Sequence, residues 1–446
     1  MTQAPVAPTL SPSPMQGWRR IFSALRHKNF RLFFYGQLIS LIGTWMDKAA
    51  EPWLVYKLTG SKILLGVITA AGTAPMLIFS FMGGSLADRL PKRSILVATQ
   101  SCMMVLAFTE AYLVWSGLVR PWQIIVLALF GGVAMAFDMP ARQSFVIEMT
   151  SREDLMNAIS LNSSIFNGAR LIGPAIAGLV MAKSIGLCFF VDGISFLAVI
   201  AGLLMMKPPR REPVAAPTSA LKHALGGLAY VRQNRRVLTL LMLFSVVGIF
   251  GWSYGVLMPS FAHDVLHMQE GGYGILMSAA GFGAMIGALV TAAVGQSMPR
   301  RPAVFGGVWL FSGMLLLFSM TRTYPLALLC LAVGSFGMMI FMSTSNTLIQ
   351  TSTPDEMRGR VMGVWALIFG GMMPIGSLFS GTMAHWVGTP ATIGFGAAVS
   401  GLAALVTWLS IRRRRASPES GAPRTGSMGE TTAETPIATT PPTPGA

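Results

Sequence analysis

Long apolar runs separated by short polar loops fill the chain from about Phe30 to Ile411. Each run approaches the roughly 20 residues that a helix needs to cross the hydrocarbon core of a membrane. In lipid, only helices and closed barrels satisfy their own backbone hydrogen bonds, and the alternating pattern of barrel strands is absent. The pattern therefore predicts an all-α membrane protein with twelve transmembrane helices in two sets of six, near residues 33–56, 63–86, 95–116, 121–141, 159–182, 186–206, 237–261, 273–295, 303–320, 324–346, 361–384 and 392–411.

The polar segments around these runs define the expected domains. Both ends of the chain are rich in Pro, Ser, Thr or Gly, a composition that cannot bury enough apolar surface to order itself. In the central linker, Leu221, Leu225 and Leu228 recur at helical spacing beside basic residues, which predicts a short amphipathic helix on the membrane surface. We divide the chain into a disordered tail (1–29), a six-helix bundle (30–206), a linker (207–236), a second six-helix bundle (237–411) and a second tail (412–446).

The charge distribution fixes the expected orientation. Hydrophobic residues make up 53% of the chain and charged residues 11%, and the mean hydropathy is +0.60, which excludes an ordinary soluble domain. Of the 33 Lys and Arg residues, 26 fall on the side of the two tails, five on the other side, and Lys48 and Arg170 within helices. This bias places both termini in the cytoplasm. The basic run from Arg412 to Arg415 then anchors the last helix and is no nucleic-acid patch.

The second bundle repeats landmarks of the first in the same order. The basic turn that begins at Pro91 after the second helix has a counterpart at Pro299 after the eighth, and Pro174 in the fifth helix corresponds to Pro374 in the eleventh. The two halves therefore keep one orientation, related by an axis along the membrane normal. This arrangement resembles the major facilitator fold, in which substrate binds between the halves near the midplane.

The loop after the second helix carries the first specific resemblance. The segment 84–93 resembles the signature loop of the major facilitator superfamily, with Pro91 where the family pattern usually has Gly. A carboxylate at this membrane face can accept hydrogen bonds from a helix N-terminus of the other half in one conformation and lose them in the other. The residues that the resemblance assigns to this gating loop are Gly84, Asp88, Arg89, Lys92 and Arg93.

Further segments narrow the resemblance. Those at 29–33, 53–61, 138–143, 157–162, 169–174 and 358–360 resemble the enterobactin exporter-like branch of bacterial drug and siderophore efflux permeases. The resemblance implies export driven by proton entry. Gly168, Gly173, Pro174 and Gly178 resemble a degenerate antiporter motif of the fifth helix, where small residues allow a close crossing against the other half. The fourth helix lacks the Arg that larger drug-antiporter branches carry, so their coupling residues cannot be transferred.

Charged residues inside the predicted spans are the candidate working groups, because each costs about 2.5–3.5 kcal/mol at a helix centre and needs a partner or a water-filled cavity. They are Asp47, Lys48, Glu51, Glu110, Asp138, Arg170 and Asp192. Asp47 and Glu51 are four residues apart and share a helical face, which favours proton coupling or binding of a cationic substrate; a local pair with Lys48 is the alternative. We expect a carboxylate partner for Arg170, either as a structural ion pair or as a charge relay.

The other buried carboxyls are less sharply placed by the sequence. Glu110 and Asp192 lie on helices that usually sit at the periphery of this fold, and they remain candidates for proton or substrate binding. Asp138 lies near the cytoplasmic end, where it is expected to hold Arg142 or the basic loop after the second helix.

The chain is therefore predicted to be a proton-coupled exporter of a small organic molecule by alternating access, and no enzyme. Movement of lysophospholipids or metabolites by the same fold, and a non-transporting sensor, are the alternatives. We expect protons and membrane lipids as further partners, no cofactor and a monomer. The single cysteines Cys102, Cys188 and Cys330, the lone pair His263 and His267, and the absence of a phosphate-binding loop give no metal site and no ATP site.

Overall fold

The computed structural model describes residues 22–206, 220–295 and 297–416, and its regular elements within these ranges are helices. The first half comprises η1 (Ser23–Arg26), α2 (Lys28–Thr59), α3 (Lys62–Arg89), α4 (Lys92–Trp115), α5 (Pro121–Glu148), α6 (Leu155–Met181) and α7 (Ile185–Met205). The linker contributes α8 (Ala220–Gln233). The second half comprises α9 (Arg235–Val246), η2 (Val247–Gly251), α10 (Ser253–Ser260), η3 (Phe261–Val265), α11 (Glu270–Val294), α12 (Arg300–Met320), α13 (Tyr324–Thr351), α14 (Asp355–Val387) and α15 (Thr389–Ala416).

The predicted number and grouping of transmembrane helices agree with the structure. Within the described ranges, eleven helical spans are long and apolar enough to cross a membrane, and one of them, Arg235–Val265, comprises α9, η2, α10 and η3. The twelfth is α2, whose 32 residues are sufficient in length but include Asp47, Lys48 and Glu51. The all-helical, two-bundle fold is confirmed.

The helices begin and end slightly beyond the predicted apolar runs. α2 begins at Lys28, inside the segment expected to be a tail, because the chain before it is fixed to α6: the Ala24 amide donates to Asn157 Oδ1, and His27 Nε2 lies 2.9 Å from Asp154 Oδ2. At the other end, α15 continues to Ala416. The amphipathic helix expected in the linker corresponds to α8, while most of both predicted tails and residues 207–219 lie outside the described residues.

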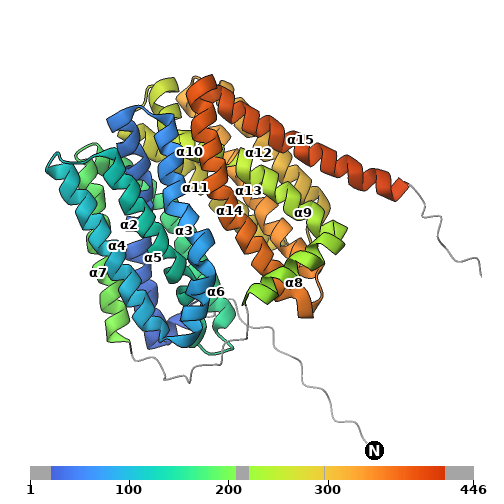
Figure 1. The fold of residues 1–446 in the computed structure, drawn as a ribbon, viewed down its shortest axis with the longest axis horizontal. Coiled ribbons are helices and arrows are strands. Elements are labelled where there is room, and N and C mark those ends of the chain that lie inside the picture. The colour runs from blue at the N-terminus through green and yellow to red at the C-terminus, as the bar shows by residue number, and fades with distance from the viewer. Residues whose placement is uncertain (1–21, 207–219, 296, 417–446) are drawn as a thin grey trace, which may run out of the picture.

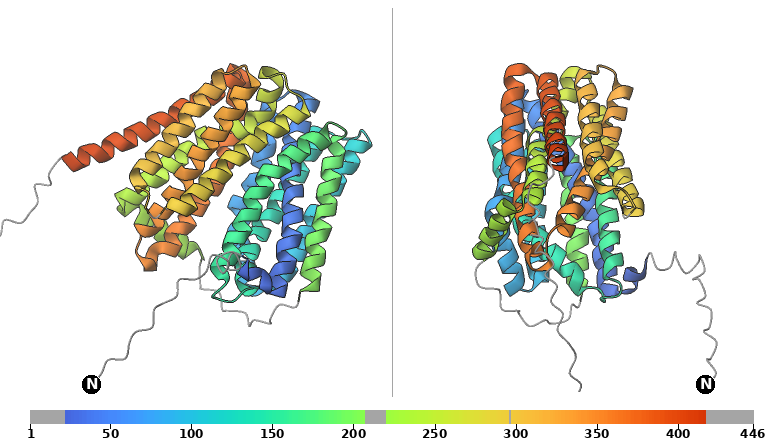
Figure 2. Two further views of the ribbon diagram at one scale, coloured as in Figure 1. Left: turned by 180° about the vertical axis from the view of Figure 1, so that it is seen from behind. Right: turned by 90° about the vertical axis from the view of Figure 1, so that its right-hand side faces the viewer.

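Each half is a helical bundle, and the halves stand side by side (Figure 1). In the first, α2 packs on α6 and α7, α3 on α5, and α4 on α7; in the second, α13 packs on α11 and α12, and α12 on α15. The most extensive contacts between the halves are made by two helix pairs, α3 with α14 and α6 with α11. We call the end where α2 finishes at Thr59 the upper end and the opposite one the lower end. The halves approach at the upper end and diverge toward the lower end (Figures 1 and 2).

Glycines allow the close approach of the halves near the upper end. A Cβ on Gly66 of α3 would collide with the backbone of α14 at Ser377, and one on Gly381 would meet Lys62 and Gly66. On the other side, a Cβ on Gly274 of α11 would collide with the backbone of α6. These two seams hold the halves together above the middle of the molecule.

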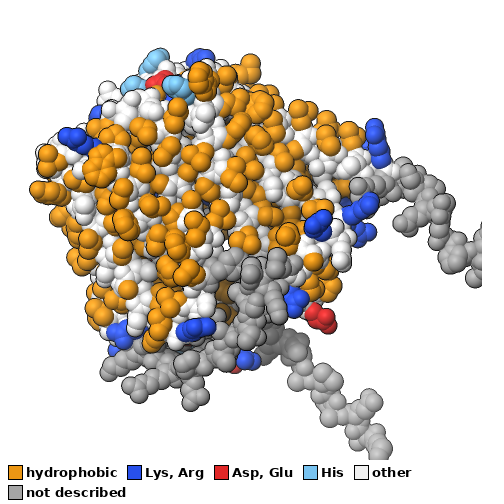
Figure 3. All heavy atoms as spheres, viewed as in Figure 1, with side chains coloured by type: hydrophobic (Ala, Val, Ile, Leu, Met, Phe, Trp, Pro, Cys, Tyr) orange, Lys and Arg blue, Asp and Glu red, His pale blue; other side chains and the backbone are white. Residues whose placement is uncertain are grey.

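The outer surface of the bundle suits a lipid environment. Hydrophobic side chains cover the visible face between the two ends, and charged side chains gather toward its margins (Figure 3). Large apolar side chains such as Leu179, Met242 and Met320 are more than half exposed. In water such a surface would be unstable, whereas in lipid it is the expected exterior.

Candidate functional site

A cavity of about 420 Å³ lies between the two halves. The first half lines it with residues of α2, α3, α4, α5 and α7, and the second half with residues of η2, α10 and α14. Glycines in its walls allow close helix packing. Gly72 and Gly132 let α3 and α5 cross closely, and Gly248 and Gly376 let η2 and α14 approach each other on the opposite side. The cavity has the position expected for a substrate site in this fold.

Four carboxyls that the sequence singled out line this cavity together. Asp47 and Glu51 come from α2, Glu110 from α4 and Asp192 from α7, with Lys48 beside them. Glu110 is 8% exposed and Asp192 3% exposed, so both are withdrawn from the lipid face. Although α4 and α7 were expected at the periphery, their acidic side chains point inward.

These carboxyls have few partners among the described residues. The carboxyls of Asp47 and Glu110 interact with each other, and Asp47 Oδ1 is buried with no hydrogen-bond partner. Asp192 Oδ1 accepts from the Ser195 hydroxyl at 3.2 Å. Within the described ranges, no ion pair is recorded for any of the four carboxyls or for Lys48. A buried acid without a cation must bind a proton or receive a cation from elsewhere, because an isolated charge is costly in this environment.

Pro52 within α2 places backbone polarity beside the same carboxyls. Pro52 has no N–H, so the carbonyl of Lys48 lacks its usual partner in the helix. Both residues line the cavity. The α2 segment from Asp47 to Pro52 therefore offers carboxyl and carbonyl oxygens to one space.

Arg170 differs from its prediction. Its guanidinium carbon lies 5.7 Å from the centre of the Trp45 ring, and Lys48 Nζ lies 5.1 Å from the centre of the same ring. Within the described ranges no carboxylate lies within ion-pair distance of Arg170, so the expected carboxylate partner is absent and cation–π contacts take its place. Arg170 is not among the residues that line the cavity.

The predicted gating loop makes its recorded contacts within the first half. Lys92 Nζ donates to Glu148 Oε1 at 2.5 Å, and Arg93 donates to the Leu204 carbonyl at 2.6 Å. A Cβ on Gly84 would meet nothing within 4 Å, and Arg89 is exposed. The Asp88 side chain lies outside the described part of the structure, so its role stays a prediction. The loop contacts fit a lower end at which the halves stand apart.

Asp138 is fully buried and fixes its neighbours inside the first half. It accepts hydrogen bonds from Thr99 at 2.9 Å and from Gln100 at 2.8 Å, and it forms an ion pair with Arg142. This is the pairing that the sequence led us to expect. Asp138 does not line the cavity, so it acts as a structural anchor between α4 and α5.

The small-residue motif of α6 is divided between two neighbours. A Cβ on Gly173 would collide with Trp45 of α2 in the same half, whereas Gly178 faces the start of α11 and Pro174 faces Gly274 in the other half. A Cβ on Gly168 would meet nothing within 4 Å. The upper part of the motif thus forms the crossing between the halves.

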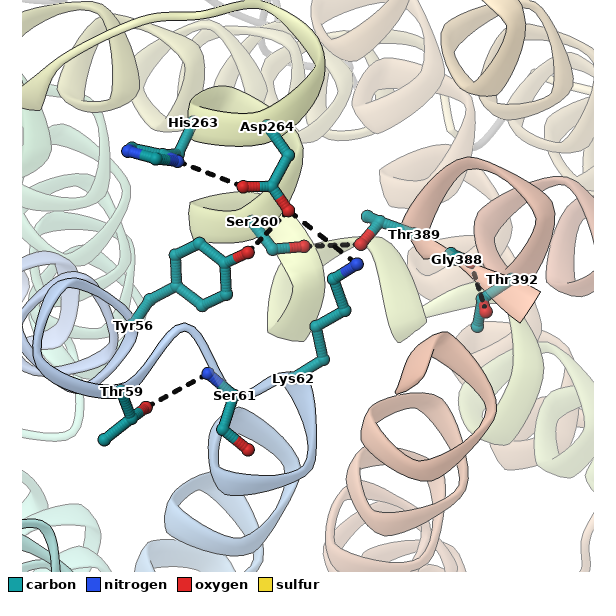
Figure 4. Close-up of polar contacts among 10 residues, drawn as sticks. All are labelled: Tyr56, Thr59, Ser61, Lys62, Ser260, His263, Asp264, Gly388, Thr389 and Thr392. Carbon is teal, nitrogen blue, oxygen red and sulfur yellow. Dashed lines mark hydrogen bonds and ion pairs between the residues drawn. The ribbon is translucent and has the colours of Figure 1, made fainter. Parts of the chain in front are cut away.

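A polar cluster closes the upper end, and the sequence analysis missed it. Tyr56 donates to Asp264 Oδ2 at 2.5 Å, Lys62 Nζ lies 3.7 Å from the same oxygen, and Lys57 donates to Glu270 Oε1 at 2.7 Å. Figure 4 shows Tyr56 and Lys62 pointing to Asp264 from α2 and α3. These contacts join the two halves, and we call the five residues the upper polar cluster.

The upper polar cluster surrounds a second cavity of about 440 Å³. His263 lines it and pairs with Asp264 at 3.0 Å, while the Trp53 and Tyr273 rings stack with centres 4.9 Å apart below it. His263 therefore belongs to the polar contacts around this cavity. In the described ranges, no group of three His, Cys, Asp or Glu residues could hold a metal ion.

Comparison with known proteins identifies the family. A family model described as "Transmembrane secretion effector" matches residues 20–433. The chain belongs to this family of major facilitator permeases. The enterobactin exporter-like resemblance, which rested on short segments, is thereby confirmed over nearly the whole chain, and the protein is a transporter of the efflux type and not an enzyme.

The names of individual relatives refer to different transported substrates. The chain is 27% identical over 380 residues to the multidrug efflux pump Tap of Mycolicibacterium fortuitum, covering 81% of this chain and 90% of the relative. It is 25% identical to the staphyloferrin A transporter of Staphylococcus aureus (78% and 87% covered) and 28% identical to the enterobactin exporter EntS of Shigella boydii (90% and 97% covered).

Solved structures support the fold of this efflux permease. The nucleoside transporter NupG aligns with a TM-score of 0.70 at 12% identity, covering 87% of this chain and 99% of that one. A bacterial homologue of the lysosomal transporter Spinster, in an inward-facing unoccupied conformation, aligns with a TM-score of 0.66 at 14% identity, covering 90% and 98%. At these identities the likeness concerns the fold alone.

Proposed function

We propose that this permease exports a small organic molecule of the drug or siderophore kind across the bacterial inner membrane, in exchange for protons. The observation that carries the proposal is the central cavity, where Asp47, Glu51, Glu110 and Asp192 face the space between the two halves, and where Glu110 and Asp192 are buried. Such carboxyls can take up protons on one side of the membrane and release them on the other. Each proton that crosses 100 mV supplies about 2.3 kcal/mol for this work.

Alternating access would act through the two ends of the molecule. The upper polar cluster joins the halves by contacts of polar side chains, while the recorded contacts of Lys92 and Arg93 remain within one half at the lower end. With the termini in the cytoplasm, as the charge bias favours, this is a conformation open toward the cytoplasm. Opening outward would require the upper polar cluster to separate and the lower ends to approach.

Gradient-driven transport in inverted membrane vesicles tests the proposal. A panel of fluorescent drugs, siderophores and lysophospholipids is offered under an imposed pH gradient, with wild-type protein, Asp47→Asn, Glu51→Gln and the control Glu153→Gln. Glu153 is an exposed carboxyl in the turn after α5, away from the cavity. We expect the two cavity variants to lose gradient-driven export and Glu153→Gln to keep it.

Two outcomes would reject the proposal. Full gradient-driven transport by both Asp47→Asn and Glu51→Gln would remove the carboxyls from the coupling mechanism. Movement of lysophospholipid alone, with no effect of the gradient, would identify a lipid transporter instead.

A further inference from the structure

The two walls of the central cavity differ in chemistry. Every ionisable residue that lines it belongs to the first half, and the lining residues of the second half are uncharged, among them Ile249, Trp252, Val256 and Met373. One wall therefore presents carboxyls and the other an aromatic and aliphatic surface. A ligand that spans the cavity contacts both walls at once.

The charged wall has an excess of acid. It holds four carboxyls and one amine, that of Lys48. If the amine balances the charge of one carboxyl, three carboxyls are left without a counter-charge. Glu110 is more than nine-tenths buried, lines the cavity and has no cation partner among the described residues; its recorded interaction is with another acid, Asp47. When these carboxyls are not protonated, a positively charged group of the ligand is the complement to this wall.

We propose that the preferred substrate of the cavity is a bulky lipophilic cation: a protonated amine, guanidinium or quaternary onium group on an aromatic or aliphatic body. The cationic group lies among Asp47, Glu51 and Glu110, and the apolar body packs on Ile249, Trp252 and Met373 of the other half. An aromatic face such as that of Trp252 also attracts cations directly. The inference rests on the proposed function, because it assigns the charge of the molecule that the same cavity exports.

The central cavity should disfavour polyanions as substrates. A multiply charged carboxylate would lie against carboxyls at short range, where like charges repel strongly in a partly desolvated space. Among the described residues that line the cavity, Lys48 is the one that offers it a counter-charge. Among the substrates suggested by the relatives' names, the cavity thus favours cationic drugs over acidic chelators.

Binding of two probes of the same shape and opposite charge tests the inference. Tetraphenylphosphonium and tetraphenylborate carry the same four phenyl groups, so their comparison isolates the sign of the charge. Binding to the purified full chain in detergent is measured by equilibrium dialysis, with protein-free micelles subtracted. We expect wild type to bind the phosphonium at least about tenfold more tightly than the borate, since the carboxylates attract the first and repel the second.

Isosteric variants assign the selectivity to the cavity. Glu110→Gln and Glu51→Gln should each weaken phosphonium binding by about tenfold without weakening borate binding. Glu153→Gln, which removes an exposed carboxyl elsewhere, should change neither affinity. The wild-type comparison stands by itself if either cavity variant fails to fold.

The outcomes separate this inference from the proposed export. Equal affinities, tighter borate binding, binding of neither probe, or phosphonium binding unchanged in both cavity variants would overturn the cation inference. Selective phosphonium binding without gradient-driven transport of any compound would support the cation site and reject proton-driven export. Gradient-driven export restricted to anions would support the transport proposal and reject the cation site.

Discussion

Loss of the Lys57–Glu270 ion pair should open the upper end of the permease. Lys57 Nζ lies 2.7 Å from Glu270 Oε1, and the two side chains are 59% and 11% exposed, respectively. The exposed amine contributes little by itself, about 0.2–1 kcal/mol for a surface pair. Its removal, however, leaves the nearly buried carboxylate of Glu270 without its partner, which costs about 1–3 kcal/mol.

This cost falls only on the conformation in which the halves meet at the upper end. In Lys57→Met, the ratio of upper-open to upper-closed molecules should therefore rise about 5- to 150-fold for this loss of about 1–3 kcal/mol. Lys183→Met is the matched control, because Lys183 is an exposed upper-end lysine with no recorded ion pair among the described residues. It should leave the ratio unchanged.

Distances between spin labels across the upper end report this ratio. Labels at Leu118→Cys and Trp386→Cys stand on exposed positions of the first and second half, and Cys102, Cys188 and Cys330 are replaced by alanine. We expect a population with a longer distance in Lys57→Met. The exchange of charges between Lys57 and Glu270 should restore the wild-type distribution. A distribution in Lys57→Met identical to that of wild type would refute the role of this pair.

Three further predictions concern the frame around the cavity. Asp138→Ala should lower stability by about 3–5 kcal/mol, because it leaves buried partners and a cation unpaired; an unchanged thermal midpoint in detergent would contradict this. Gly274→Ala should destabilise the α6–α11 seam by about 1–3 kcal/mol, whereas Gly313→Ala, whose Cβ meets nothing within 4 Å, should not lower the midpoint. The hydrogen bond from Ser23 of η1 lowers the pKa of Asp154 below its ordinary value of 3.8. This hydrogen bond is therefore present above pH 3.8, and it is lost as the pH falls through the lowered pKa of Asp154. Hydrogen exchange of η1 should therefore rise below about pH 4, and a flat profile down to about pH 2 would exclude the link.

The sequence predicted the helices well because the apolar signal of a membrane span is strong and local. Its errors lie at the ends. α14 was predicted from residue 361 but begins at Asp355, because the polar first turn from Asp355 to Arg360 continues the helix beyond the apolar run. α2 likewise begins at Lys28, where contacts with α6 fix the entering chain.

The site could be predicted only in part. Asp47 and Glu51 share a helical face by their spacing alone, so their common cavity followed from the sequence. The inward position of Glu110 and Asp192 depends on how α4 and α7 rotate against their neighbours. That rotation is set by contacts such as Gly43 against Asp192 and Ser195, which no local pattern reveals.

The upper polar cluster escaped the sequence analysis for a related reason. Its contacts join residues 208 and 213 positions apart, Tyr56 with Asp264 and Lys57 with Glu270. Lys57 is one of the five basic residues counted on the outer side, and Asp264 directly follows His263 in the chain. The sequence does show opposite charges in the two upper-end loops, Lys57 and Lys62 in one and Asp264 and Glu270 in the other. This complementarity could have predicted the contact.

The access of solvent to the cavity from each side of the membrane tests the central claim most directly. Thr69 lines the cavity, and a cysteine at this position can be labelled by a membrane-impermeant maleimide. The account predicts fast labelling in inverted vesicles, slow labelling in intact cells, and faster labelling in intact cells when Lys57→Met is added. Equal labelling of Thr69→Cys from both sides, or labelling from neither, would contradict a cavity that opens to one side at a time.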